Sequence, residues 1–518
     1  MTSIDKREES VNDKTPYSRK LIYNSLFNLS ATIGTALIAF FLVPFLVKYL
    51  GKDGYGVWTL VGSVFAYTMT LELGLSSAIN RYVPVLLVKE DRRGIESVIS
   101  ASMVFLSFVG FVLVVVAVVV FYNLDTWFAI PPDLAPQGRM VVLIVGVCFA
   151  LSMPIRPFGA VISGLQRYDI LSLGNFIPVL IRAILVVGLL TAGYGLVAVG
   201  LVYGFCELTI VLVFFVFSRR LLGPFSLYFK RIDFTLLKEM LAYGINTFLY
   251  ITAAIIVYKG SDIIIGVFLT ARDVTRFAIA AAPLLIVSQL LQASMAALKP
   301  AVSDLDARND EERVREISFL SQKYSLLLLL PAISFLILMG REFLVLWVGS
   351  DFAELSVILA VLAVGRLLML AQYSNFLVLV GKGEHKVFGA MAVSVAVIAM
   401  VLGVVFVGVL DLGIMGMAVA SVVPMTVIYG VVMPAYYSRR MKISLKENVR
   451  FVLNPALLGT AVAVAVIALW KFVYPPTSWL QLGMVMVSVI VAWAISVWKA
   501  SLTEVEKNRL LRIVRKSS

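Results

Sequence analysis

Apolar residues are grouped along this chain in runs that are long enough to cross a lipid bilayer. A helix needs about 20 residues to span the hydrocarbon core, and each run reaches roughly that length. The pattern predicts an all-α polytopic membrane protein with about 14 transmembrane helices. The runs lie at about 21–47, 56–80, 98–122, 140–161, 171–192, 195–217, 240–268, 275–298, 319–340, 355–380, 388–410, 413–436, 453–473 and 480–499.

The second half of the chain repeats the first at an offset of about 220 residues, a spacing typical of internally duplicated proteins. Residues 49–58 (YLGKDGYGVW) correspond to 268–279 (FLTARDVTRFAI), and Gly164 corresponds to Gly381. Further pairs are Asp53 with Asp273, Val83 with Val302, Arg93 with Arg313 and Glu96 with Glu316. Each repeat holds an even number of helices, six, so the two enter the membrane in the same orientation and form a parallel pseudo-twofold pair.

This repeat divides the chain into segments. We expect two six-helix lobes joined by a cytoplasmic linker, with two further helices outside the repeat, numbered 13 and 14, and a basic tail on the inner leaflet. The segments are a cytoplasmic tail at 1–20, the lobes at 21–220 and 240–440, the linker at 221–239, the two extra helices at 441–500 and the basic tail at 501–518.

The composition supports the assignment as a membrane protein and excludes some classes of function. The chain is 60% hydrophobic and 14% charged, with a net charge of +13. The basic residues cluster beside the apolar runs on one predicted side, which indicates topology signals and no nucleic-acid partner. Both termini are therefore expected to be cytoplasmic. The spacing of Cys148 and Cys206 predicts neither a disulfide nor a metal site, and the single His385 argues against histidine catalysis.

We single out seven of the charged residues inside the predicted spans, where ionisable groups are costly and often functional. The cations are Arg156, Arg182, Lys259 and Arg366, and the acids are Glu72, Glu207 and Asp262. They have two interpretations. One is a neutralised structural network, including an i, i+3 ion pair between Lys259 and Asp262. The other is a watery substrate path, favoured slightly by the polar stripes that accompany the charges.

The substrate-path interpretation assigns a role to each group. The four cations would attract an anion such as phosphate or pyrophosphate, which arginine can hold through a bidentate fork. Polar side chains that would meet a glycan are Tyr250, Tyr258, Gln289, Gln292 and Tyr373. The three acids would bind H⁺ or Na⁺ for coupling. We expect no other cofactor. Pro154 and Pro157, on either side of Arg156, predict a bend in that helix.

Several blocks resemble bacterial polysaccharide-transport proteins of the O-antigen flippase type. They are residues 24–82 (beginning NSLFNLSATIGTAL), 164–176 (GLQRYDILSLGNF) and 297–310 (ALKPAVSDLDARND). This family belongs to the multidrug, oligosaccharidyl-lipid and polysaccharide exporter superfamily. The resemblance implies translocation of an undecaprenyl-pyrophosphate-linked oligosaccharide to the periplasmic leaflet by alternating access through a V-shaped cationic cavity. It also implies a location in the bacterial inner membrane, with membrane lipids and the polysaccharide polymerase machinery as partners.

A fourteen-helix relative in that superfamily, the lipid II flippase, has a groove for the lipid tail formed by its last two helices. Its charged pair early in helix 1 is replaced here by Asn24 and Asn28, which argues against the lipid II role. The alternatives are a multidrug cation antiporter of the same superfamily and, from a different class, a membrane polysaccharide polymerase or ligase. The enzyme alternative is disfavoured because no long outer loop carries catalytic side chains. A scaffold that transports nothing gives no reason for buried charges.

Overall fold

The computed structural model describes residues 16–223, 233–508 and 511, and all regular structure in that part of the chain is helical. Thirteen of its helical segments are long and apolar enough to cross a membrane. One of them, Ser30–Glu72, is two spans, because α2 (Pro16–Ala66) leaves helical geometry at Gly51, with φ of 73° and ψ of 172°. Divided there, the described chain has fourteen spans, and the predicted all-α fold is confirmed.

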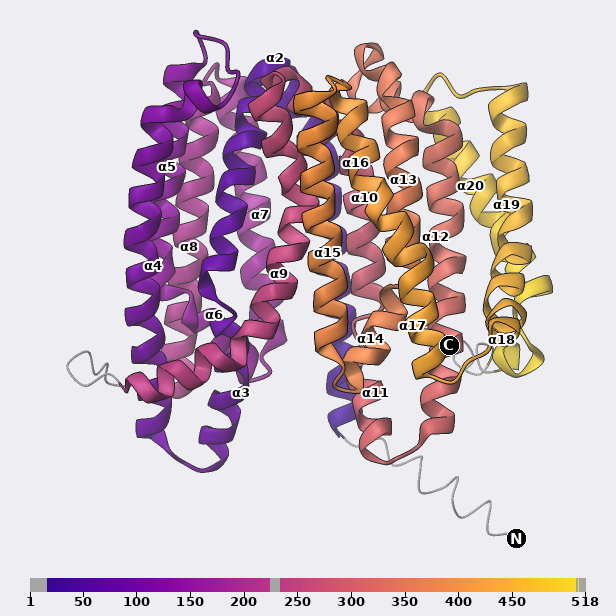
Figure 1. Ribbon diagram of the computed structural model, residues 1–518, viewed down its shortest axis with the longest axis horizontal. Helices are drawn as coiled ribbons and strands as arrows, with labels where there is room; N and C mark the ends of the chain where they lie inside the picture. Colours follow the sequence, from indigo (N-terminus) through magenta and orange to yellow (C-terminus); the bar gives the residue numbers. More distant parts are fainter. Residues whose placement is uncertain (1–15, 224–232, 509–510, 512–518) are drawn as a thin grey trace.

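The helices form two groups and a peripheral pair (Figure 1). The first lobe contains α2 (Pro16–Ala66), η1 (Tyr67–Glu72), α3 (Leu75–Val88), α4 (Arg92–Trp127), α5 (Ala135–Ser152), η2 (Met153–Ile155), α6 (Pro157–Gly164), α7 (Tyr168–Thr191) and α8 (Leu196–Leu222). The second lobe contains α9 (Phe234–Phe268), α10 (Ala271–Ser294), α11 (Leu298–Ala307), α12 (Glu311–Val348), η3 (Ser350–Leu355), α13 (Ser356–Ala371), α14 (Tyr373–Gly381), α15 (His385–Gly403), η4 (Val404–Val409), α16 (Gly413–Val427), η5 (Ile428–Val432) and α17 (Met433–Arg440). The peripheral pair contains α18 (Leu445–Asn448), η6 (Val449–Leu453), α19 (Asn454–Val473), α20 (Trp479–Ser496) and η7 (Val497–Ser501).

The peripheral pair packs on the second lobe through α12, and α19 lies at the edge of the molecule in Figure 1. Because the number of spans is even, α2 begins and η7 ends on one side of the bundle, which we call the terminal side. The opposite side, which holds Gly51 and Gly349, is the far side. The expected tail 1–20, linker 221–239 and basic tail 501–518 lie partly outside the described residues.

The second span of each lobe is a broken helix, which the sequence did not predict. In the first lobe, Leu73 and Gly74 take left-handed backbone angles and separate η1 from α3. In the second lobe, α10 ends at Ser294, and residues 298–307, which were predicted as a connection, form α11. The fourth span of each lobe is broken too, at η2 in the first lobe and at Gln372 in the second. The bend predicted at Pro154 and Pro157 is confirmed, because η2 lies between α5 and α6. Each break interrupts the regular hydrogen bonding of a membrane helix, so it brings polar backbone to membrane depth.

Local structure reproduces the sequence repeat residue by residue. Asp91 caps α4 by accepting a hydrogen bond from the Gly94 amide, and Asp310 caps α12 by accepting one from the Arg313 amide. The residues just before these caps, Glu90 and Asn309, both have left-handed φ angles, of 56° and 57°. Gly164 packs against Asn80 and Pro84, while Gly381 packs against Lys299 and Val302. Equivalent caps and contacts at offsets close to 220 residues support duplication of one six-helix unit.

The two lobes meet on both sides of the bundle. On the far side, Lys52 pairs with Asp351 at 2.8 Å and Asp53 pairs with Arg272 at 2.8 Å. On the terminal side, α9 runs against α3, and Arg81 lies over the Tyr243 ring at 4.6 Å. The lobes are therefore held together at two levels by contacts that would have to separate if one lobe rocked against the other.

Gly56 is the tightest of the far-side contacts, and it gives a test of this packing. A Cβ at Gly56 would lie 1.8 Å from the carbonyl oxygen of Ala271 in the other lobe, whereas a Cβ at Gly62 on the same helix would meet nothing within 4 Å. We expect Gly56→Ala to destabilise the protein by about 1–3 kcal/mol. Gly62→Ala should be neutral or stabilise it by up to about 1 kcal/mol, since alanine favours the helix. Thermal unfolding in detergent checks this, and equal shifts for the two variants would contradict it.

Candidate functional site

Three of the predicted site residues form one network inside the first lobe. One Nη of Arg156 donates to a Glu72 carboxylate oxygen at 2.9 Å, and the other donates to Glu207 at 2.7 Å. Ser76 also donates to Glu72, at 2.8 Å. The three charged side chains are only 10–17% exposed. We call Glu72, Arg156 and Glu207 the Arg156 triad. With both acids ionised, the triad carries one net negative charge.

The helix breaks explain how the Arg156 triad is assembled. Glu72 is the last residue of η1, at the break in the second span, and Arg156 lies between η2 and α6, at the break in the fourth. Glu207 comes from α8, which is continuous. For these residues the structure shows an ion-pair network, one of the two interpretations that the sequence left open, with one acid more than it has cations. Arg156 is fully engaged by carboxylates in this conformation.

Lys259 and Asp262 form the second network, at the boundary between the lobes. α9 is continuous through Gly260 and Ser261, so the two side chains are one helical turn apart, with Lys259 Nζ 3.3 Å from Asp262 Oδ2. The same oxygen accepts a hydrogen bond of 2.7 Å from Ser63 on α2 of the first lobe. Asp262 is 4% exposed, whereas the Lys259 side chain is 33% exposed. The predicted ion pair is thus present, and its lysine is still accessible.

Arg182 and Arg366 are not in ion pairs among the described residues. Arg182 on α7 lies over the Tyr203 ring at 4.4 Å, and its buried Nε has no hydrogen-bond acceptor in the described chain. Arg366 on α13 is 9% exposed and lies over the Tyr258 ring at 4.4 Å. The four cations thus occupy separate surroundings, two with carboxylates and two with aromatic rings.

The other predicted contacts are scattered. Tyr258 contacts Arg366, and Tyr373 packs against Phe376 at 5.7 Å. On α10, Gln289 is exposed and Gln292 is half-buried, and neither side chain has a hydrogen bond within the described ranges. The Tyr250 side chain lies outside the described residues.

Sequence reasoning missed one buried ion pair. Lys323 on α12 is 4% exposed, and its Nζ lies 2.5 Å from Glu506, beyond the last span. Burial tends to raise the pKa of the Glu506 carboxyl, but hydrogen bonds from Lys323, the Thr503 amide and the Tyr324 hydroxyl hold that pKa below its usual value. The sequence feature that could have indicated this ion pair was the position of Lys323 inside the predicted span 319–340. Its partner could not be identified, because it lies so far along the chain.

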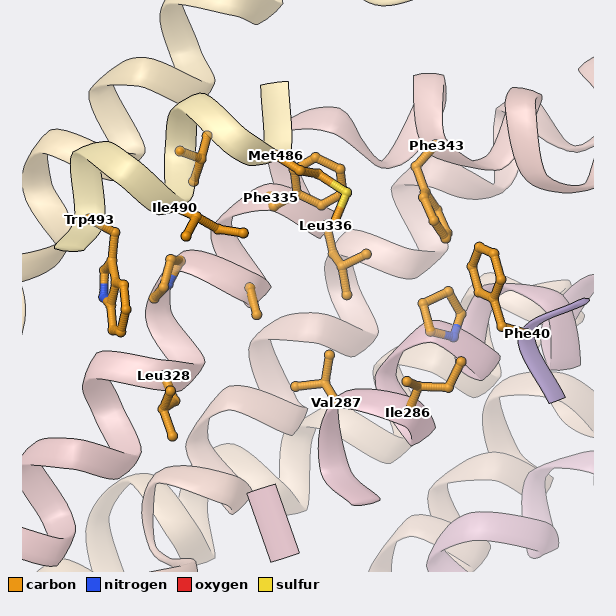
Figure 2. A pocket seen from close by; sticks show the side chains of 14 residues that line it. Phe40, Ile286, Val287, Leu328, Phe335, Leu336, Phe343, Met486, Ile490 and Trp493 are labelled. Carbon is orange, nitrogen blue, oxygen red and sulfur yellow. The ribbon is translucent and has the colours of Figure 1, made fainter. Parts of the chain in front are cut away.

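An apolar groove runs between the second lobe and the peripheral pair, with a volume of about 410 Å³. Figure 2 shows Trp493 and Leu328 at one end and Phe343 and Phe40 at the other. The groove is lined by Phe40, Pro283, Ile286, Val287, Leu328, Pro331, Ala332, Phe335, Leu336, Phe343, Met486, Val489, Ile490 and Trp493. Its one side-chain donor is occupied, since the Trp493 indole N–H donates to the Leu327 carbonyl at 3.0 Å. Leu328, Met486 and Ile490 are about half exposed, so the groove is open to the surroundings of the bundle.

No sequence pattern predicted the groove, because its residues come from four helices. The V-shaped central cavity stays a prediction.

The described residues include no group of three or more His, Cys, Asp or Glu side chains that could hold a metal ion, and Cys148 and Cys206 are free thiols.

Comparison with known proteins shows which family and which relatives this chain resembles. A family model described as polysaccharide biosynthesis protein matches residues 21–306. The uncharacterized membrane protein EpsK of Bacillus subtilis (strain 168) is 24% identical over 505 residues, which cover 96% of this chain and 99% of EpsK.

Two solved structures show the same fold. The inward-facing conformation of a MATE family multidrug resistance transporter of the MOP superfamily has a TM-score of 0.63 at 15% identity and covers 81% of this chain and 98% of its own. The lipid II flippase MurJ, in an inward closed conformation, has a TM-score of 0.66 at 14% identity and covers 92% of this chain and 97% of its own. Both likenesses concern the fold.

Proposed function

The chain belongs to the family of polysaccharide biosynthesis proteins, and on that premise we propose that it is a flippase for a lipid-linked oligosaccharide. Its substrate would be an undecaprenyl-pyrophosphate-linked repeat unit, carried from the cytoplasmic to the periplasmic leaflet. The terminal side of the bundle would face the cytoplasm. The lobes would alternate access by separating first on one side and then on the other.

The apolar groove is the observation that carries this proposal. A polyprenyl tail is a long hydrocarbon, and a channel for it needs apolar walls with no unsatisfied polar group. The groove meets both conditions, and its half-exposed rim at Leu328, Met486 and Ile490 would let a tail enter from the bilayer. Phe40 of α2 closes the end of the groove nearest the first lobe, so a bound tail would extend toward the boundary between the lobes.

The pyrophosphate would bind to the cations that are not fully paired with carboxylates. Lys259 is the best placed, because it lies at the lobe boundary and a third of its side chain is exposed. Arg182 and Arg366 would contribute once the lobes separate, while Arg156 would stay with its two acids. The glycan would contact the tyrosine and glutamine side chains named above.

Coupling to H⁺ or Na⁺ would use the acids. The Arg156 triad has one carboxylate more than it has cations, so it can take up a proton or a monovalent cation without leaving a charge unbalanced. Asp262 is the second candidate, because its carboxylate bridges Lys259 and Ser63 across the lobe boundary. Loading either site would change the charge balance that holds its helices together.

A multidrug cation antiporter is the second candidate, favoured by the net negative charge of the Arg156 triad and by the MATE fold. The two functions differ in what they require of the groove. An organic cation would need an acid beside its binding surface, and none lines the groove.

Complementation tests the proposed function. The chain is expressed in a bacterial strain that lacks its own lipid-linked oligosaccharide flippase and is matched in glycan type. The proposal predicts restored surface polysaccharide and a fall in the accumulated lipid-linked intermediate. Drug resistance without surface polysaccharide would favour the antiporter, and new glycosidic bonds formed by the purified protein would favour the polymerase or ligase alternative.

Filling the groove should block this activity. Ala332→Trp places a large ring within the groove, while Val491→Trp adds the same ring at a position of α20 that is 51% exposed and does not line it. We expect Ala332→Trp to reduce surface polysaccharide by at least about tenfold, as an obstructed apolar subsite would lose one to three kcal/mol of tail binding. Val491→Trp should behave like the wild type. Equal activity of the two variants at equal protein levels would remove the groove from the mechanism.

A further inference from the structure

Arg366 is a buried cation whose charge no carboxylate balances within the described ranges. Its guanidinium lies over the Tyr258 ring at 4.4 Å, and one Nη lies 4.0 Å from Met369 Sδ. By contrast, the buried cations Arg156 and Lys323 have carboxylate oxygens within 2.9 Å. A ring face and a thioether compensate only part of a positive charge, and an uncompensated buried charge is strongly unfavourable.

A small cavity of about 30 Å³ adjoins this guanidinium. It lies inside the second lobe between α9, α10, α13 and α16, and its polar lining consists of Arg366, Tyr258, Ser261 and Ser421. The other lining residues are apolar: Val257, Phe277, Ala281, Leu284, Leu362, Val422 and Met425. The lining contains no acid, so the cavity is electrostatically positive.

Of the two serines that line this space, one has a hydroxyl proton that no strong acceptor takes. Ser421 donates to the Met417 carbonyl at 3.0 Å, so its proton is already used. Ser261 lies 3.4 Å from the Ser421 hydroxyl, which leaves Ser261 in contact with a weak acceptor only. A ligand that accepts hydrogen bonds would therefore find two kinds of donor here, the Arg366 guanidinium and the Ser261 hydroxyl.

Size decides which anion fits. About 10–15 Å³ of such space holds one water molecule, so 30 Å³ has room for a single ion a little larger than water. Phosphate and pyrophosphate are too large for it while the lobe stays closed. Water fits but is neutral, and it would leave the Arg366 charge unbalanced.

We propose that the cavity lined by Arg366, Ser261 and Ser421 is a binding site for one monovalent anion of chloride size. The ion accepts hydrogen bonds from the guanidinium and from Ser261, and it links α9 with α13 and α16. Because α9 also carries Lys259 and Asp262, the anion stabilises the helix that forms the lobe boundary. In the closed conformation this site would hold the ion whatever the transported substrate is, and Arg366 would meet a pyrophosphate only after the lobes separate.

Bromide identifies the ion directly. Crystals of the full chain are grown with bromide in place of chloride, and anomalous scattering is measured. The proposal predicts a peak in the cavity, within hydrogen-bond distance of Arg366 and Ser261, that is absent in Arg366→Met. A cavity that is empty or holds only water in the wild type would overturn it.

Thermal unfolding gives a second, independent readout. Replacing gluconate with chloride at constant ionic strength should raise the unfolding midpoint of the wild type by about 2 °C. Arg366→Met should lose this shift. Arg182→Met is the matched control, because it also removes an arginine stacked on tyrosine, but in the other lobe, and it should keep the shift. The same response in all three proteins would mean a general salt effect and would contradict the proposal.

If Arg366→Met does not fold, the anion site can be tested with the wild-type protein alone. Because a single site saturates, the unfolding midpoint of the wild type should level off as chloride or bromide replaces gluconate at constant ionic strength. A midpoint that keeps rising in proportion to the halide concentration, as in a general salt effect, would overturn the assignment.

Discussion

Replacing Arg156 with methionine is expected to destabilise the protein by about 3–5 kcal/mol, the largest loss of stability among the substitutions considered. The change leaves Glu72 and Glu207 facing each other with no counter-charge, and both side chains are largely buried. The triple variant Arg156→Met, Glu72→Gln, Glu207→Gln should recover most of the stability, because it removes all three charges together. Thermal unfolding in detergent measures each step.

Arg167 provides the control for this series. It pairs with Asp169 at 2.8 Å, but both side chains are about 40% exposed, so Arg167→Met should cost no more than about 1 kcal/mol. If Arg156→Met proved no more destabilising than Arg167→Met, the Arg156 triad would not be a buried network. If the triple variant were as unstable as the single one, the loss would come from packing and not from unpaired charge.

Lys259→Ala is expected to reduce surface polysaccharide by roughly tenfold or more in the complemented strain, because a charged hydrogen bond to the pyrophosphate is worth about 1.5–3 kcal/mol. Lys259→Arg keeps the charge and should retain most activity. Lys238→Ala removes a lysine from the exposed beginning of the same helix and should have no effect. Surface polysaccharide is quantified at equal protein levels.

Stability must be followed in parallel, because Lys259→Ala also removes the ion-pair partner of Asp262. The double variant Lys259→Ala, Asp262→Asn separates the two effects. If the lysine acts only as a counter-charge, the double variant regains activity. If it binds the substrate, activity stays low while stability returns. Normal polysaccharide in stable Lys259→Ala protein would remove this residue from the site.

Most of the fold followed from the sequence because its determinants are local. Each span is visible in the sequence as an apolar run, and the repeat is visible in residue pairs such as Arg93 and Arg313, which lie in the first turns of α4 and α12. The bend beside Pro154 was predictable for the same reason. The break at Leu73 and Gly74 was not, because a single glycine in an apolar run is common and only its contact with Gly244 in the other lobe requires it.

The site was less predictable because its partners are distant in sequence. The contact between Lys259 and Asp262 could be read from helical spacing. The Arg156 triad draws on three separate spans, and nothing in the order of residues says that Glu72 faces Glu207. Ser63 gave no signal as a partner of Asp262, since it lies in the other lobe. The groove and the Arg366 cavity are spaces between helices, so their shapes depend on packing that no single segment encodes.

Reconstitution tests the central claim most directly. Purified protein is placed in liposomes that contain an undecaprenyl-pyrophosphate-linked repeat unit, and the fraction of glycan in each leaflet is measured with a membrane-impermeant lectin. The proposed function predicts that the wild type transfers the labelled lipid between leaflets, and that Ala332→Trp and Lys259→Ala do so far more slowly than Val491→Trp and Lys238→Ala. Transfer no faster than in protein-free liposomes, together with movement of organic cations, would contradict it.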